Sequence, residues 1–172
     1  MANILIQLST SLKADRSDTN IRRWGRYVID NNIALESLLP ILGHEKRVAT
    51  GFIWMVGGIC ELAPTVVLPC VSRFYAMRHE VPIVNYDRSL AKMFWLAGVP
   101  AEIEGEVIDQ LFKWLLGSNI TVTTKNYSMF ALYKLCGQYP ELKNELKITL
   151  EDQLDKNTAD FKKRGMKMLE EL

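Results

Sequence analysis

Residues 101–117 read AEIEGEVIDQLFKWLLG, and their spacing indicates a helix with one apolar face. The apolar side chains recur at intervals of three and four residues and so share one stripe of an α-helix: Ile103, Val107, Ile108, Leu111, Phe112 and Leu115. The acidic side chains lie on the other faces: Glu102, Glu104, Glu106 and Asp109. Because these acids radiate in several directions, we interpret them as a solvated face rather than as a cation site.

The same periodicity extends in both directions along the chain and predicts helices almost throughout. A first helix is expected around residues 4–12, and a second begins after a cap at Asp18 or Thr19. Further helices are expected at about 33–42, 44–62, 65–79, 86–98, 101–117, 123–138, 141–155 and 158–171. The short alternating stretch at residues 120–123 is interpreted as a loop with Thr123 or Thr124 as a cap, so no sheet is predicted.

Prolines and basic residues recur with a period near 40 residues. Pro64, Pro100 and Pro140 each precede an amphipathic stretch, at intervals of 36 and 40 residues. A basic residue recurs at intervals of 41, 37 and 37 residues, at Arg47, Arg88, Lys125 and Lys162. Such a period is typical of a two-helix repeat that buries its apolar face by stacking on its neighbours. The sequence therefore predicts an all-α, right-handed α-α superhelix of about five antiparallel helix pairs, forming one domain over residues 1–172.

Composition indicates that net charge does not select a partner, so any partner must be recognised locally. The 172 residues are 48% apolar, and 21 basic residues nearly balance 20 acidic ones, so no net field draws the chain to nucleic acid or to an anionic membrane. Three cysteines without a CxxC motif, Cys60, Cys70 and Cys136, are typical of reduced core thiols. With no signal-peptide pattern at the N-terminus, these features favour a cytoplasmic protein.

One apolar stretch resembles a membrane segment. Residues 48–60 carry no charge, and apolar residues continue after Glu61. A membrane-spanning helix needs about 20 consecutive apolar residues, whereas Glu61 and Pro64 divide this stretch into two shorter pieces. We therefore expect a buried helix hairpin and no contact with a membrane.

Several short motifs resemble a group of short bacterial HEAT-like proteins over about residues 44–172. The motifs are Phe112-x-Trp114-Leu115, Lys125-x-Tyr127-Ser128-Met129, Leu132-Tyr133-x-Leu135, Pro140-Glu141-Leu142-Lys143 and Phe161-Lys162-x-Arg164. The resemblance implies a HEAT/ARM-like solenoid. Members of this group are often labelled adenylosuccinate lyase, but the chain has no counterpart of that enzyme's Ser-rich, Met-Pro-Lys-containing loop, so no catalytic residue is carried over. The wider class also includes glycosylases that act on alkylated DNA.

No catalytic, metal or cofactor motif can be assembled from the sequence. His44 and His79 form neither an i, i+4 pair nor a Cys/His cluster, so we expect no metal site and no cofactor. Gly51, Gly57 and Gly58 are not followed by the Gly-Lys-Ser/Thr of a phosphate loop, and we expect them to allow close helix packing. The sequence thus favours a protein that is not an enzyme.

The one pattern that points to binding is basic and aromatic. It comprises Arg22, Arg26, Arg47, Arg73 and Arg88 with Tyr75 and Tyr86. Corresponding positions of successive repeats align along one face, so these side chains could form a groove for a carboxylate-bearing peptide or a nucleic-acid backbone. The alternative is surface charge stacked on exposed rings. We accordingly predict a non-enzymatic protein-interaction scaffold, with a nucleic-acid-binding protein related by fold to the HEAT-like glycosylases as the alternative.

Overall fold

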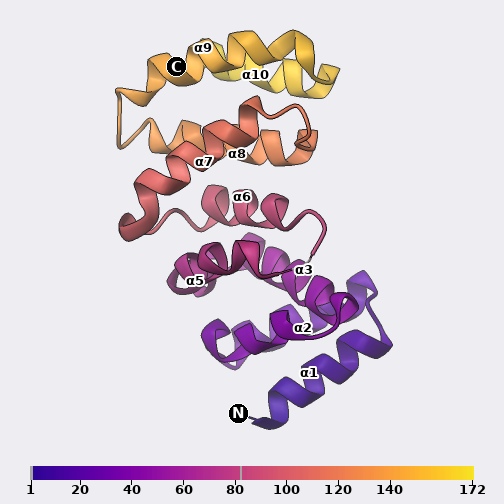
Figure 1. Ribbon diagram of the computed structural model, residues 1–172. Coiled ribbons are helices and arrows are strands. Elements are labelled where there is room, and N and C mark those ends of the chain that lie inside the picture. The colour runs from indigo at the N-terminus through magenta and orange to yellow at the C-terminus, as the bar shows by residue number, and fades with distance from the viewer. Residues whose placement is uncertain (1, 82) are drawn as a thin grey trace. The chain divides into compact units, whose positions relative to one another are not determined.

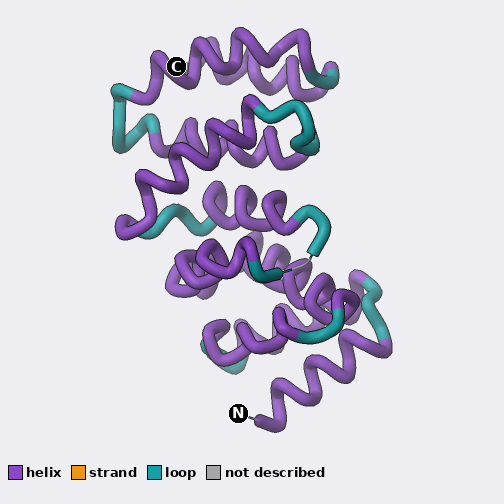
Figure 2. The backbone as a smooth tube through the Cα atoms, in the orientation of Figure 1, coloured by secondary structure: helices purple, strands orange, loops and turns teal. Residues whose placement is uncertain are grey.

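The computed structural model describes residues 2–81 and 83–172, and this part of the chain consists of helices joined by loops (Figure 2). No strand occurs within it, which confirms the all-α prediction. The chain divides into two compact units, Met1–Pro100 and Ala101–Leu172. The single domain over residues 1–172 stays a prediction.

The first unit is organised around one long, buried helix. Its helices are α1 (Ala2–Ala14), α2 (Asp18–Asp30), η1 (Leu35–Gly43), α3 (Lys46–Leu62), α4 (Pro64–Val67), η2 (Leu68–Cys70), α5 (Val71–Ala76), η3 (Met77–His79) and α6 (Tyr86–Leu96). Helix α3 contacts α1, α2, η1, α4 and α6. Its uncharged sequence therefore serves burial inside the unit: Phe52, Ile53, Met55, Val56 and Ile59 are fully or almost fully buried.

The second unit stacks two antiparallel helix pairs (Figure 1). Its elements are η4 (Ala101–Ile103), α7 (Glu104–Leu116), α8 (Val122–Leu135), α9 (Leu142–Gln153), η5 (Leu154–Lys156) and α10 (Ala159–Glu171). The apolar stripe of α7 packs on α8 and α9, and α10 packs on α9 and α8. The core side chains that bind these layers together are Leu111, Leu115, Met129, Leu132, Leu146, Leu150 and Phe161.

Two helix predictions differ from the structure because of internal prolines. The helix expected at 33–42 is the 3₁₀ helix η1, which contains Pro40, and the single helix expected at 65–79 is divided into four short segments around Pro69. Proline has no N–H to donate and its ring disfavours a continuous α-helix on its N-terminal side. The prolines that begin helices were recognised in the sequence, but the effect of these internal ones was not.

The N-cap residues of α2 and α8 both lie before the residues that the sequence predicts as caps. Ser17 caps α2 by accepting a hydrogen bond at Oγ from the N–H of Asn20, over 3.2 Å, whereas Asp18 lies in the first turn. Thr121 caps α8 in the same way, accepting from the N–H of Thr124 over 3.3 Å. Both cap residues have the extended backbone that an N-cap requires.

None of the helices in residues 2–81 and 83–172 combines the length and the apolar character that crossing a bilayer requires. The hairpin expected around Glu61 and Pro64 is present as α3 followed by the short α4, but only its α3 arm is largely buried: Val67 is the one buried residue of α4, and Leu62 is exposed.

Candidate functional site

A groove lies between α2 and α3 in the first unit, and α6 contributes one side chain to it. We call it the α2–α3 groove. Its volume is about 280 Å³, and it is lined by Asp18, Ile21, Arg22, Gly25, Arg26, Trp54, Met55, Gly58, Glu61, Leu62 and Lys92. The groove thus combines apolar side chains with charges of both signs.

Trp54 is the largest apolar side chain of the groove. It remains 42% exposed although α3 is otherwise largely buried. The guanidinium of Arg16 lies 4.9 Å from the centroid of its ring, so one side of the indole is held by a cation–π contact. Leu62, at the end of α3, is also exposed and lines the same groove. These two side chains offer apolar surface at separate places along the groove.

The charges of the groove differ in how they are paired. Arg22 and Asp18 form an i, i+4 ion pair of 2.7 Å, and Lys92 binds Glu61 over 2.6 Å. Arg26 is exposed and has no ion pair within the described residues. Three cations against two carboxylates leave the groove one positive charge, and Arg26 is the side chain that can accept a new carboxylate without losing an old one.

Gly58 forms an open part of the groove between these groups. A Cβ built at this position meets no heavy atom within 4 Å. The expectation that the glycines of α3 allow close packing is therefore confirmed at Gly51, whose Cβ would lie 3.2 Å from Leu12 Cδ2, and is wrong at Gly58. There the missing side chain leaves open space, and no neighbouring helix approaches it.

The structure brings together two of the arginines predicted from the sequence, Arg22 and Arg26 on successive turns of α2. The other three do not line the groove. Arg47 donates Nε–H to the carbonyl of Lys13 over 3.1 Å, Arg73 is exposed on α5, and Arg88 is half-buried on α6.

The two predicted tyrosines do not belong to a groove, because both are buried in the first unit. Tyr75 packs edge-on against Phe94 with centroids 5.7 Å apart, and the guanidinium of Arg78 lies 3.9 Å from its ring centroid. Tyr86 donates its hydroxyl to the carbonyl of Phe74 over 3.0 Å, and burial raises the pKa of its phenol. A buried tyrosine that finds a hydrogen-bond partner stabilises the core. The spacing of a tyrosine in the sequence does not show whether it stabilises the core in this way or binds a ligand.

Sequence reasoning missed Trp54, Gly58, Glu61 and Lys92 as members of a common site. The Glu61–Lys92 ion pair joins residues 31 positions apart, so only tertiary structure brings them together. An available signal was the uncharged run of α3, which contains a tryptophan, Trp54, and a glycine, Gly58, that are not fully buried.

The cysteines and histidines form no comparable site. Cys60, Cys70 and Cys136 are buried and form no disulfide, and burial raises the pKa of the Cys70 and Cys136 thiols, which disfavours the reactive thiolate. Across residues 2–81 and 83–172, no three His, Cys, Asp or Glu side chains gather as a metal site would require.

Comparison with known proteins supports the repeat architecture. A family model described as a HEAT repeat domain matches residues 8–167, which is nearly the whole chain. No match was found among curated proteins or among solved structures.

Proposed function

The chain belongs to the HEAT repeat family, and we propose that it is a non-enzymatic scaffold that binds a segment of a partner protein in the α2–α3 groove. The observation that carries the proposal is a groove that contains the exposed Trp54, the unpaired Arg26 and the open surface at Gly58. An apolar anchor flanked by a free cation suits a segment with an aromatic or aliphatic residue next to a carboxylate.

Two further proposals concern the setting of this function. The match to the family model spans both units, which supports a single HEAT-like repeat domain over residues 1–172. Three buried cysteines that form no disulfide support function in a reducing compartment, for which we propose the cytoplasm.

A protein segment fits the groove better than a nucleic-acid backbone does. Asp18 and Glu61 line the groove and would repel successive phosphates, whereas a peptide presents one carboxylate at a time. Phosphate-backbone binding gains from several cations in a row, and here two of the three cations are already paired. Duplex DNA is therefore the alternative that the experiment must separate from a peptide.

The test is a selection of random displayed peptides on the immobilised full chain, followed by affinity measurements on the selected sequences. We expect enrichment of peptides in which acidic residues flank an aromatic or aliphatic residue. Arg26→Glu should weaken their binding by about tenfold or more, since a hydrogen bond to a charged group contributes roughly 1.5–3 kcal/mol. Gly58→Leu should weaken it by a comparable factor because the added side chain fills the open part of the groove.

The matched control is Arg73→Glu, which makes the same charge change on an exposed arginine of α5 that does not line the groove. It should bind the selected peptides as the parent chain does. Equal losses in Arg73→Glu and Arg26→Glu would assign the effect to overall charge and overturn the proposal. Salt-sensitive binding of duplex DNA that is lost in Arg26→Glu would favour the nucleic-acid alternative.

A further inference from the structure

A second cavity lies wholly within the second unit, where the loop after α7 meets the end of α9 and the start of α10. Its volume is about 660 Å³, which is within the range of small-molecule sites. The lining residues are Leu116, Ser118, Ile120, Val122, Lys125, Asp152, Gln153, Lys156, Asn157 and Thr158. One wall is aliphatic, and the rest carries hydroxyl, amide and charged groups.

Lys125 is the unusual member of this lining, because its side chain is charged and only 4% exposed. Its ammonium donates a hydrogen bond of 2.9 Å to Gln153 Oε1, and this amide oxygen is a neutral acceptor. No carboxylate forms an ion pair with it among the described residues. Burial of a cation is costly unless an anion compensates it, and the ammonium retains two further N–H donors. Asp152 acts on the Lys125 ammonium only from beyond ion-pair distance, and the nearby ammonium of Lys156 opposes its effect.

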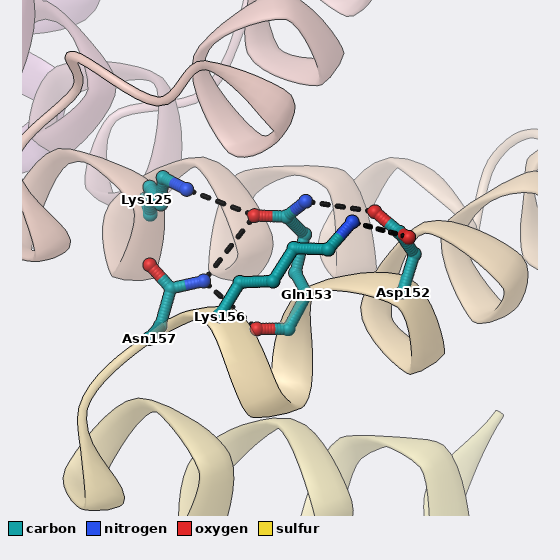
Figure 3. A network of polar contacts seen from close by, with 5 residues as sticks. All are labelled: Lys125, Asp152, Gln153, Lys156 and Asn157. Carbon is teal, nitrogen blue, oxygen red and sulfur yellow. Dashed lines mark hydrogen bonds and ion pairs between the residues drawn. The ribbon is translucent and has the colours of Figure 1, made fainter.

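The surrounding amide network fixes the orientation of these groups (Figure 3). Gln153 Oε1 also accepts from Asn157 Nδ2 over 3.2 Å, while Gln153 Nε2 donates to Asp152 Oδ2 over 2.9 Å. Asp152 Oδ1 in turn accepts from Lys156 over 2.6 Å. If the Gln153 amide were flipped, its NH₂ would face the ammonium of Lys125, so the arrangement has one orientation. The cavity is therefore lined by polar groups that are already ordered.

We propose that this cavity binds a small carboxylate with a short aliphatic group, with Lys125 as the cation that pairs with the carboxylate. Two lysines and one aspartate give the cavity one net positive charge, which matches the single charge of a carboxylate. A phosphate carries closer to two negative charges and would be repelled by Asp152. The aliphatic group lies against Leu116, Ile120 and Val122.

The test uses 4-methylpentanoate as the probe and isothermal titration with the full chain as the measurement. The neutral control is 4-methylpentanamide, which keeps the shape and lacks the charge. We expect the acid to bind and the amide to bind at least about tenfold more weakly, because only the acid pairs with the buried ammonium. Equal binding of acid and amide, or tighter binding of inorganic phosphate than of the acid, would overturn the proposal.

Variants test the role of Lys125 directly. Lys125→Met keeps a long unbranched side chain without the charge and should weaken acid binding by about tenfold or more. Lys134→Met makes the same replacement at an exposed lysine of α8 that does not line the cavity, and should leave binding unchanged. Binding that is unchanged in Lys125→Met would contradict the assignment.

A second pair of variants keeps the test valid if Lys125→Met does not fold. Leu116 is half exposed at the cavity, so polar replacements there do not disturb the core. Leu116→Glu should weaken binding of the acid several-fold more than Leu116→Gln does, since the two differ chiefly in charge. Identical affinities in this pair would overturn the proposal.

A tripeptide ending in leucine distinguishes the two sources of such a carboxylate. Tighter binding of the tripeptide than of 4-methylpentanoate identifies a peptide C terminus as the ligand, and weaker binding identifies a free acid.

Discussion

Replacing Gly58 by alanine is expected to stabilise the protein by about 0.5–1 kcal/mol. Gly58 lies in the interior of α3, where glycine is less favourable than alanine by about this amount because it has more conformational freedom to lose on folding. The new Cβ would meet no heavy atom within 4 Å, so no steric clash offsets the gain. For a chain of this length, the Tm should rise by about 1–4 °C.

Gly51→Ala in the same helix is the matched control for this prediction. Its Cβ would lie 3.2 Å from Leu12 Cδ2 and 3.4 Å from Arg16 Cγ, and Leu12 is fully buried and has little room to move. The gain in helix propensity should therefore be largely cancelled by crowding. Urea unfolding and thermal unfolding followed by circular dichroism measure both variants. The reasoning is refuted if Gly58→Ala is destabilised, or if Gly51→Ala is stabilised as much as Gly58→Ala.

Three other predictions follow from the described contacts. Ser17→Ala should lower the free energy of unfolding by about 1 kcal/mol and Ser17→Gly by only a few tenths, as measured by urea unfolding; equal losses would mean that the Ser17 cap contributes little. Phe161→Ala should cost about 3–5 kcal/mol because this ring is fully buried in the second unit, and a loss below about 1 kcal/mol in the same assay would contradict the packing described. Burial lowers the pKa of Lys125 below its ordinary value of 10.5. At alkaline pH the unfolded chain therefore binds more protons at this residue than the folded chain does. The contribution of Lys125 to the free energy of unfolding consequently rises with pH until the pH reaches about 10.5. The stability of the parent chain relative to Lys125→Met should therefore increase between pH 7 and about 10, and a flat or falling difference would contradict this sign.

The helical architecture could be predicted because it depends on local spacing. The stripe of residues 101–117 recurs in the structure as α7, whose Val107, Leu111 and Leu115 are fully buried. Caps and helix breaks were less predictable. Whether Ser17 or Asp18 caps α2 depends on the backbone conformation at one residue, and two neighbouring residues of similar cap preference give no basis for choosing.

The candidate site could be predicted only in part because burial is a tertiary property. Arg22 and Arg26 lie on one helix four residues apart, so the sequence alone places them on one face. Tyr75 and Tyr86 show the opposite case: a tyrosine suits either a surface or a core in which its hydroxyl finds an acceptor, and the carbonyl of Phe74 is that acceptor for Tyr86. The contribution of α6 to the groove, through Lys92, required the fold itself.

The recurring basic position shows how the same repeat signal leads to different roles. Arg47 donates to a backbone carbonyl, and Lys162 forms an ion pair of 2.5 Å with Asp155. Lys125 is instead buried against the neutral Gln153. The repeat fixes only the backbone position of the basic residue. The residues around the end of its side chain decide whether the charge is paired within the chain. At Lys125 no carboxylate of the described residues comes within ion-pair distance, and this difference from Lys162 is the physical reason for expecting a carboxylate from a ligand.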